Sequence, residues 1–113
     1  MAYFFKKDSM EFKPHPRFKG VGFLPLIDKA QDQGLSVSML EIEPGIEIPI
    51  HIHETQADSI YVLSGEGQAF VNGEWQAISE GDYILVPSGE EHGVKNTGNQ
   101  VLKLFIVHVP PLF

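Results

Sequence analysis

Apolar and polar residues alternate along much of this 113-residue chain. The clearest run is Ile46, Ile48, Ile50 and Ile52, which recur at every second position and predict a strand with one apolar face. Successive side chains of a strand point to opposite faces, so the residues between these isoleucines face the other way. The same type of pattern predicts strands at residues 21–27, 35–42, 83–86 and 101–109.

The strongest local turn signal is Asn72-Gly73. Residues 68–71 and 74–78 flank this pair, whose composition is preferred in a two-residue hairpin turn with both central residues at positive φ. No window combines a helical apolar period with helix caps. With 11 Gly and 8 Pro marking frequent turns, we predict about eight or nine strands in an all-β antiparallel sandwich or barrel.

The domain organisation is expected to be simple. Residues 1–18 are irregular and predict an N-terminal arm or edge strand, and residues 19–113 predict a single β-barrel domain. The final strand, residues 101–109, is apolar on both faces, and only Lys103 and His108 interrupt it. A strand of this kind is covered on both sides, so we expect the arm or a second subunit to cover its outer face. We therefore predict a homodimer.

Composition narrows the range of partners. The formal net charge is −7, with 8 Lys and Arg against 15 Asp and Glu, which disfavours binding to nucleic acid or to an anionic membrane. The chain has no cysteine, so it forms neither disulfides nor thiolate metal sites. Neither a secretory signal nor an apolar run of about 20 residues is present. We expect a soluble cytoplasmic protein whose partner is a small molecule.

Candidate chemistry is concentrated in His51, His53, Asp58 and His92. Residues 51 and 53 share one face of the predicted strand, opposite Ile50 and Ile52. Three imidazole nitrogens and one carboxylate oxygen form a donor set that suits a divalent transition metal. The other two histidines, His15 and His108, are more typical of structural or interface residues, although His108 could approach the pocket. The four candidates lie in two spaced segments, Gly45-x5-His51-x-His53-x4-Asp58-x6-Gly65 and Gly81-x5-Pro87-x-Gly89-x2-His92-x3-Asn96.

These segments resemble the paired motifs of the cupin superfamily, whose members are small double-stranded β-helix, or jelly-roll, barrels. The family pattern has Gly-x5-His-x-His-x3–4-Glu-x6-Gly followed by Gly-x5-Pro-x-Gly-x2-His-x3-Asn. Every position matches except one, where this chain has Asp58 in place of Glu. The resemblance covers residues 20–110 and implies that His51, His53 and His92 bind a metal ion.

Asp58 is the departure from the family pattern. Its side chain is one methylene shorter than that of Glu and reaches about 1.3 Å less far, whereas metal–ligand bonds tolerate only about ±0.2 Å. Three arrangements remain open: direct ligation after a backbone shift, a bridging water, or an outer role in which Asp58 orients an imidazole. Glu54 and Gln56 are weaker candidates because both lie in the expected turn.

The resemblance also implies a function. A six-coordinate ion with three histidines and one carboxylate keeps two positions for water, dioxygen or substrate. We predict one divalent ion (Fe, Ni, Mn, Zn or Cu) in a dioxygenase-type enzyme acting on a small organic substrate. Its pocket would be walled by residues such as Ile60, Val62 and Phe70. A lyase or isomerase on a similar site is one alternative, and a non-catalytic cupin that binds or senses a small ligand is the other.

Overall fold

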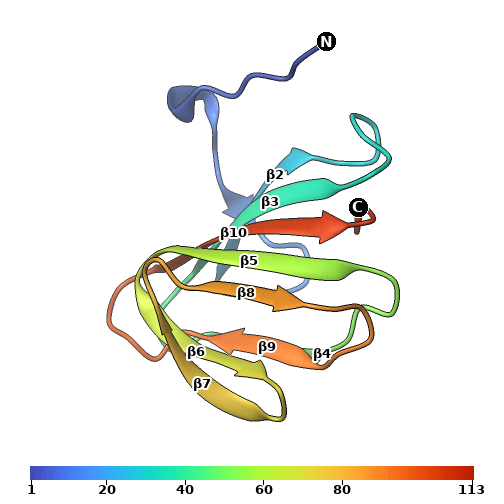
Figure 1. The fold of residues 1–113 in the computed structure, drawn as a ribbon. Coiled ribbons are helices and arrows are strands. Elements are labelled where there is room, and N and C mark those ends of the chain that lie inside the picture. Colours follow the sequence, from blue (N-terminus) through green and yellow to red (C-terminus); the bar gives the residue numbers. More distant parts are fainter.

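The computed structural model describes residues 1–113 as an all-β fold of ten strands in two antiparallel sheets (Figure 1). This agrees with the predicted fold class. The six-stranded sheet has the order β1 (Lys13–Pro14), β2 (Val21–Ile27), β3 (Ser36–Ile42), β10 (Leu102–Val109), β5 (Ala57–Ser64) and β8 (Tyr83–Val86). The four-stranded sheet has the order β4 (Glu47–His51), β9 (His92–Lys95), β6 (Glu66–Val71) and β7 (Glu74–Ser79).

The core lies between the two sheets and follows from the alternation in the sequence. In β3 and β10 every second side chain is buried, as expected for strands with one face toward the interior. Strand β10 lies in the middle of the larger sheet, between β3 and β5. The most deeply buried large side chains come from these three strands: Ile42, Val62, Leu102 and Leu104.

Strand β4 does not keep the continuous apolar face that its four isoleucines predict. Ile48 pairs with Val94 and His51 pairs with His92, so β4 carries one more residue than β9 between these two pairs. Such a bulge reverses the alternation that follows it. Ile48 is therefore buried, whereas Ile50 and Ile52 are 40% and 48% exposed. The predicted single apolar face is therefore wrong, and Ile50 and Ile52 line the same cavity as His51 and His53.

Turn geometry agrees with the predicted glycine positions. Asn72 and Gly73 both have positive φ, 54° and 81°, and connect β6 to β7 as a tight hairpin. Gly65 also has a positive φ, 88°, and a Cβ atom there would lie 2.6 Å from the carbonyl oxygen of Val101. This position therefore requires glycine both for its backbone conformation and for the close approach of the neighbouring chain.

The N-terminal residues lie against the larger sheet only from β1 onward. A single 3-10 turn spans Lys7–Ser9, and the preceding residues extend away from the barrel (Figure 1). A Cβ atom on Gly22 of β2 would lie 3.6 Å from the Phe12 side chain, and the Lys103 ammonium lies 5.4 Å from the centre of the Phe12 ring. Phe12 of the arm therefore lies near the Lys103 end of β10. No helix in the structure has the length and apolar character needed to cross a membrane.

Asn96 connects the loops at the far end of the barrel. Its side-chain amide donates hydrogen bonds to the carbonyl oxygens of Ile42 and Gln100, at 2.8 and 2.7 Å. Its side-chain oxygen accepts a hydrogen bond from the backbone N–H of Gly98 at 2.9 Å. The residue is only 2% exposed, so water cannot replace these partners.

We expect Asn96→Ala to lower the free energy of unfolding by about 2–4 kcal/mol, because it leaves buried backbone groups without partners. Urea denaturation followed by circular dichroism measures this change. Asn99→Ala is the matched control, since Asn99 is an exposed asparagine in the same loop. Equal stability of the two variants would contradict the proposed role of the amide.

Candidate metal centre

Four strands bring the candidate residues to one end of the barrel, the end toward which β10 points in Figure 1. His51 ends β4 and His92 begins β9, and the two are direct cross-strand partners in the smaller sheet. Asp58, near the start of β5, is the cross-strand partner of His108 on β10 in the larger sheet. The site therefore lies between the two sheets and receives side chains from both.

His51, His53 and His92 form a triad. Their candidate ligand nitrogens lie within 4.8 Å of one another. The Nδ1 atom of His51 lies 2.7 Å from the carbonyl oxygen of Pro49, and that of His92 lies 3.1 Å from the carbonyl oxygen of Glu90. A carbonyl only accepts, so Nδ1 carries the proton in both rings and Nε2 is the nitrogen left to bind a metal.

Asp58 is buried among the imidazoles, with 4% of its surface exposed. One of its oxygens, Oδ2, lies 3.0 Å from His92 Nε2, 3.3 Å from His108 Nε2 and 3.7 Å from His53 Nε2. Burial alone would raise the pKa of Asp58, but hydrogen bonds from His108 and His92 outweigh that effect and hold this pKa well below its usual range. The carboxylate is therefore ionised.

The same carboxylate affects the imidazoles unequally. Burial acts to lower the pKa of His92. Its hydrogen bonds to Asp58 and to the Glu90 carbonyl together have the larger effect and raise this pKa. Burial and the neighbouring His51 lower the pKa of His53 to about 4. Burial also lowers the pKa of His51. His51 and His53 are thus neutral donors at pH 7, the form that binds metals.

The donor set fits a divalent cation. Nδ1 of His92 donates its proton to a carbonyl, so Nε2 of the neutral ring carries no proton. Nε2 can therefore lie 3.0 Å from the ionised Asp58 only when a second proton or a cation lies between them. A divalent ion can take the place of that proton and bind His51 and His53 as well. The charge on Asp58 and the neutral nitrogens around it match what such an ion requires.

His108 also belongs to this cluster, although the sequence analysis did not include it among the candidate ligands. It was expected to be a structural or interface residue, yet it is only 6% exposed and contacts Asp58. A second group of candidate ligand atoms, within 4.8 Å of one another, consists of His53, Asp58 and His108. The alternation of Leu102, Leu104 and Ile106 in the last strand was the signal that could have placed His108 on the inner face.

Two further sequence candidates lie outside the cluster. Glu54 is exposed, and the Gln56 amide donates to the Pro111 carbonyl oxygen at 3.2 Å instead of facing the histidines. His15 accepts hydrogen bonds at Nδ1 from the backbone N–H groups of Arg17 and Phe18, which is a structural role within the arm.

The histidines form part of the wall of a cavity of about 750 Å³. Ile60 lines it as expected, together with Leu40, Leu104 and Ile106. The prediction for two other residues is wrong. Val62 is fully buried in the core, and Phe70 lies on the outside of its sheet, packed edge-on against Trp75. The cavity is closed by residues near both ends of the chain: His15, Pro16, Arg17, Phe18, Leu112 and Phe113.

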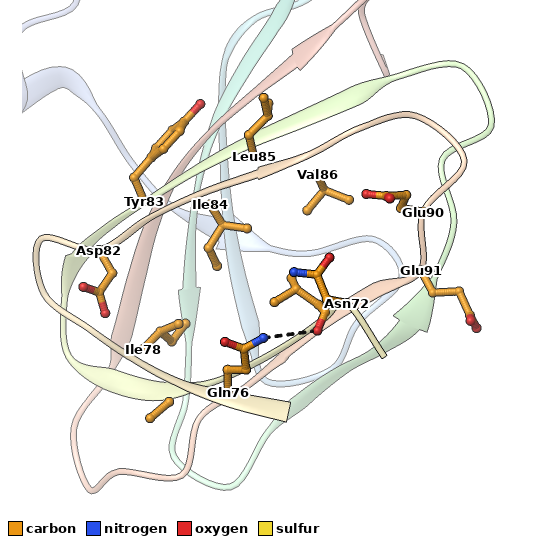
Figure 2. A pocket seen from close by; sticks show the side chains of 12 residues that line it. Asn72, Gln76, Ile78, Asp82, Tyr83, Ile84, Leu85, Val86, Glu90 and Glu91 are labelled. Carbon is orange, nitrogen blue, oxygen red and sulfur yellow. Dashed lines mark hydrogen bonds between the residues drawn. The ribbon is translucent and has the colours of Figure 1, made fainter. Parts of the chain in front are cut away.

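A smaller hollow of about 380 Å³ lies elsewhere, beside β7 and β8, the edge strands of the two sheets. Figure 2 shows the carboxylates of Asp82, Glu90 and Glu91 around it, with Tyr83 and Leu85 along β8. No histidine lines it, so it lacks the nitrogen donors found in the larger cavity.

Comparisons with known proteins agree with this architecture. The cupin domain family matches residues 38–108. An oxalate-binding protein of Thermotoga maritima is 37% identical over 68 residues, which are 60% of this chain and only 56% of that relative. The crystal structure of a predicted oxalate decarboxylase from Thermotoga maritima has a TM-score of 0.77 at 30% identity, with 89% of this chain and 91% of that chain covered.

A second solved structure shares the fold at lower identity. It is an RmlC-like cupin from Shewanella frigidimarina, with a TM-score of 0.83 and 20% identity, covering 99% of this chain and 94% of that one. The family match and the shared fold agree with each other. The chain belongs to the cupin family.

Proposed function

We propose that this cupin holds one divalent transition metal ion through His51, His53, Asp58 and His92 and is a dioxygenase-type enzyme acting on a small organic acid. The observation that carries the proposal is the meeting of three imidazoles and an ionised carboxylate in the wall of a largely apolar cavity. A buried donor set of this kind, open to a cavity, is typical of a site where a metal and a small molecule meet.

Arg17 supports an anionic substrate. Arg17 lines the cavity, and its positive charge contributes to lowering the pKa of both His15 and His51. A guanidinium group suits a carboxylate because it offers several N–H donors in a planar fork. The oxalate-binding relative also supports a carboxylate ligand.

Some residues of the site would form the binding cavity, and others would orient the histidine ligands. The apolar wall, which includes Leu40 and Ile106, excludes water and so strengthens electrostatic interactions in the cavity. The Pro49 and Glu90 carbonyls fix the orientation of His51 and His92. A bound ion would supply Lewis acidity or, for a redox-active metal, electron exchange with dioxygen.

A non-catalytic binding protein is the second candidate function. The name of the Thermotoga maritima relative describes binding and not conversion. In this case the ion and Arg17 would hold a small carboxylate without changing it.

We also propose that the protein forms a homodimer through the outer face of its larger sheet. Tyr61, Tyr83 and Leu85 are exposed there on β5 and β8. Phe105 on β10 lies directly beside Tyr61, and Tyr61 lies beside Tyr83. Contiguous exposed apolar side chains of this type typically mark an interaction surface.

The metal and the activity are tested together. Untagged protein should contain bound metal and should consume dioxygen with a small carboxylic acid, a catechol, a flavonol or a thiol. His51→Ala should lose metal and turnover, because one of the three imidazole donors is removed. Elemental analysis and an oxygen electrode provide the measurements.

Glu74→Gln is the control for this test, since Glu74 is exposed on β7 and does not line the cavity. Tight binding of a carboxylate without turnover, whichever metal is supplied, would support the binding protein instead. Absence of any metal affinity in the wild-type protein would contradict both functions.

Arg17→Gln should weaken binding of oxalate by about tenfold, because a charge-assisted hydrogen bond is lost. Isothermal titration calorimetry on the metal-loaded protein measures the change. Lys19→Gln removes the same charge from an exposed residue that does not line the cavity. If both variants bind oxalate equally well, Arg17 does not contact the ligand.

Light scattering after size exclusion should give about 25 kDa, twice the 12.6 kDa chain mass. Leu85→Lys should shift the protein to the monomer, because it places a charge within the apolar face. Val101→Lys changes an exposed apolar residue outside that face and should remain dimeric. A wild-type mass of one chain would disprove the dimer.

A further inference from the structure

The four-ligand set does not account for the position of His108. This imidazole is 6% exposed, and its only polar contact is Asp58, whose Oδ2 atom lies 3.3 Å from its Nε2 atom. Oδ1 of Asp58 is buried without a hydrogen-bond partner. A buried polar group without partners is rare in native proteins and calls for an explanation such as a bound ion.

The distances around Asp58 are those of neighbouring ligands on one ion. In an octahedral site with bonds of about 2.1 Å, adjacent ligand atoms lie about 3 Å apart. Oδ2 of Asp58 lies 3.0 Å from His92 Nε2 and 3.3 Å from His108 Nε2. The two imidazoles thus approach the carboxylate with nearly equal geometry, although only His92 belongs to the family motif.

The short side chain of Asp58 strengthens this argument. Where cupins have Glu, this chain has a carboxylate that reaches about 1.3 Å less far from β5, so an ion bound to it would lie nearer to that strand. Strand β10 is the neighbour of β5, and His108 is paired directly with Asp58. A shift of the ion toward β5 therefore also moves it toward His108. His53 belongs to both candidate groups and lies between them.

We propose that His108 is a fifth protein ligand of the metal ion, binding through Nε2. This inference rests on the proposed metal-binding function. The ion would then have four imidazoles and one carboxylate, and an octahedral ion would keep one exchangeable position instead of two. A substrate would bind through a single oxygen atom, and its second polar group would be left for Arg17.

The competing role for His108 is a hydrogen bond that only orients Asp58. His108→Gln separates the two roles, since a glutamine amide can donate to the carboxylate but is a poor ligand for a transition metal. His108→Ala removes both functions. Co(II) is a suitable probe because its X-ray absorption spectrum reports the number of bound imidazoles.

The wild-type Co(II) protein should show four imidazoles, and both variants should show three. Competition with a chelating dye should give a Co(II) affinity at least tenfold lower in both variants than in the wild type. Thermal unfolding of the metal-free proteins checks that the fold is intact. A loss of affinity without a loss of the folded state assigns the effect to the metal site.

Three imidazoles in the wild type, or wild-type affinity in His108→Gln, would overturn the fifth-ligand assignment while leaving the four-ligand centre in place. Failure of the wild-type protein to bind Co(II), Fe(II), Mn(II), Ni(II), Cu(II) or Zn(II) would instead refute the proposed function itself. The two failures are therefore distinguishable.

Discussion

The buried negative charge of Asp58 is the constraint around which this end of the barrel is organised. An ionised carboxylate away from water requires compensation, and here the nearest groups are imidazoles from both sheets. His51 and His92 belong to the smaller sheet, and Asp58 and His108 belong to the larger one. A cation at this place would link the two layers in a chain that has no cysteine to form a disulfide.

Much of the fold could be predicted because it depends on local patterns. Alternation locates the main strands, and Asn72-Gly73 specifies a hairpin whose φ angles are as expected. The extra residue in β4 could not be predicted in the same way. Whether Ile50 or His51 faces the interior depends on pairing with β9, more than 40 residues away, and that pairing does not appear in the local period.

The candidate site shows the same limit. Motif spacing singles out His51, His53 and His92, and the structure brings these three side chains together. His108 carries no motif, and its importance depends on which residue stands opposite on β5, which is a matter of register. Arg17 lies in an irregular segment with no period at all, so its place in the cavity wall becomes visible only when the arm is folded against the barrel.

Two parts of the chain form the wall of the cavity, and they differ in how far their residues are constrained by the sheets. The strands carry His51, His92 and His108 and cannot shift without disturbing both sheets, whereas residues 15–18, Leu112 and Phe113, which also line the cavity, lie outside the strands. Phe113 is held in place by two contacts: its ring packs edge-on against Phe23, and its carbonyl oxygen accepts a hydrogen bond from the Lys29 N–H. Selectivity for one small molecule over another can therefore evolve by exchanging terminal residues while the reactive centre stays unchanged.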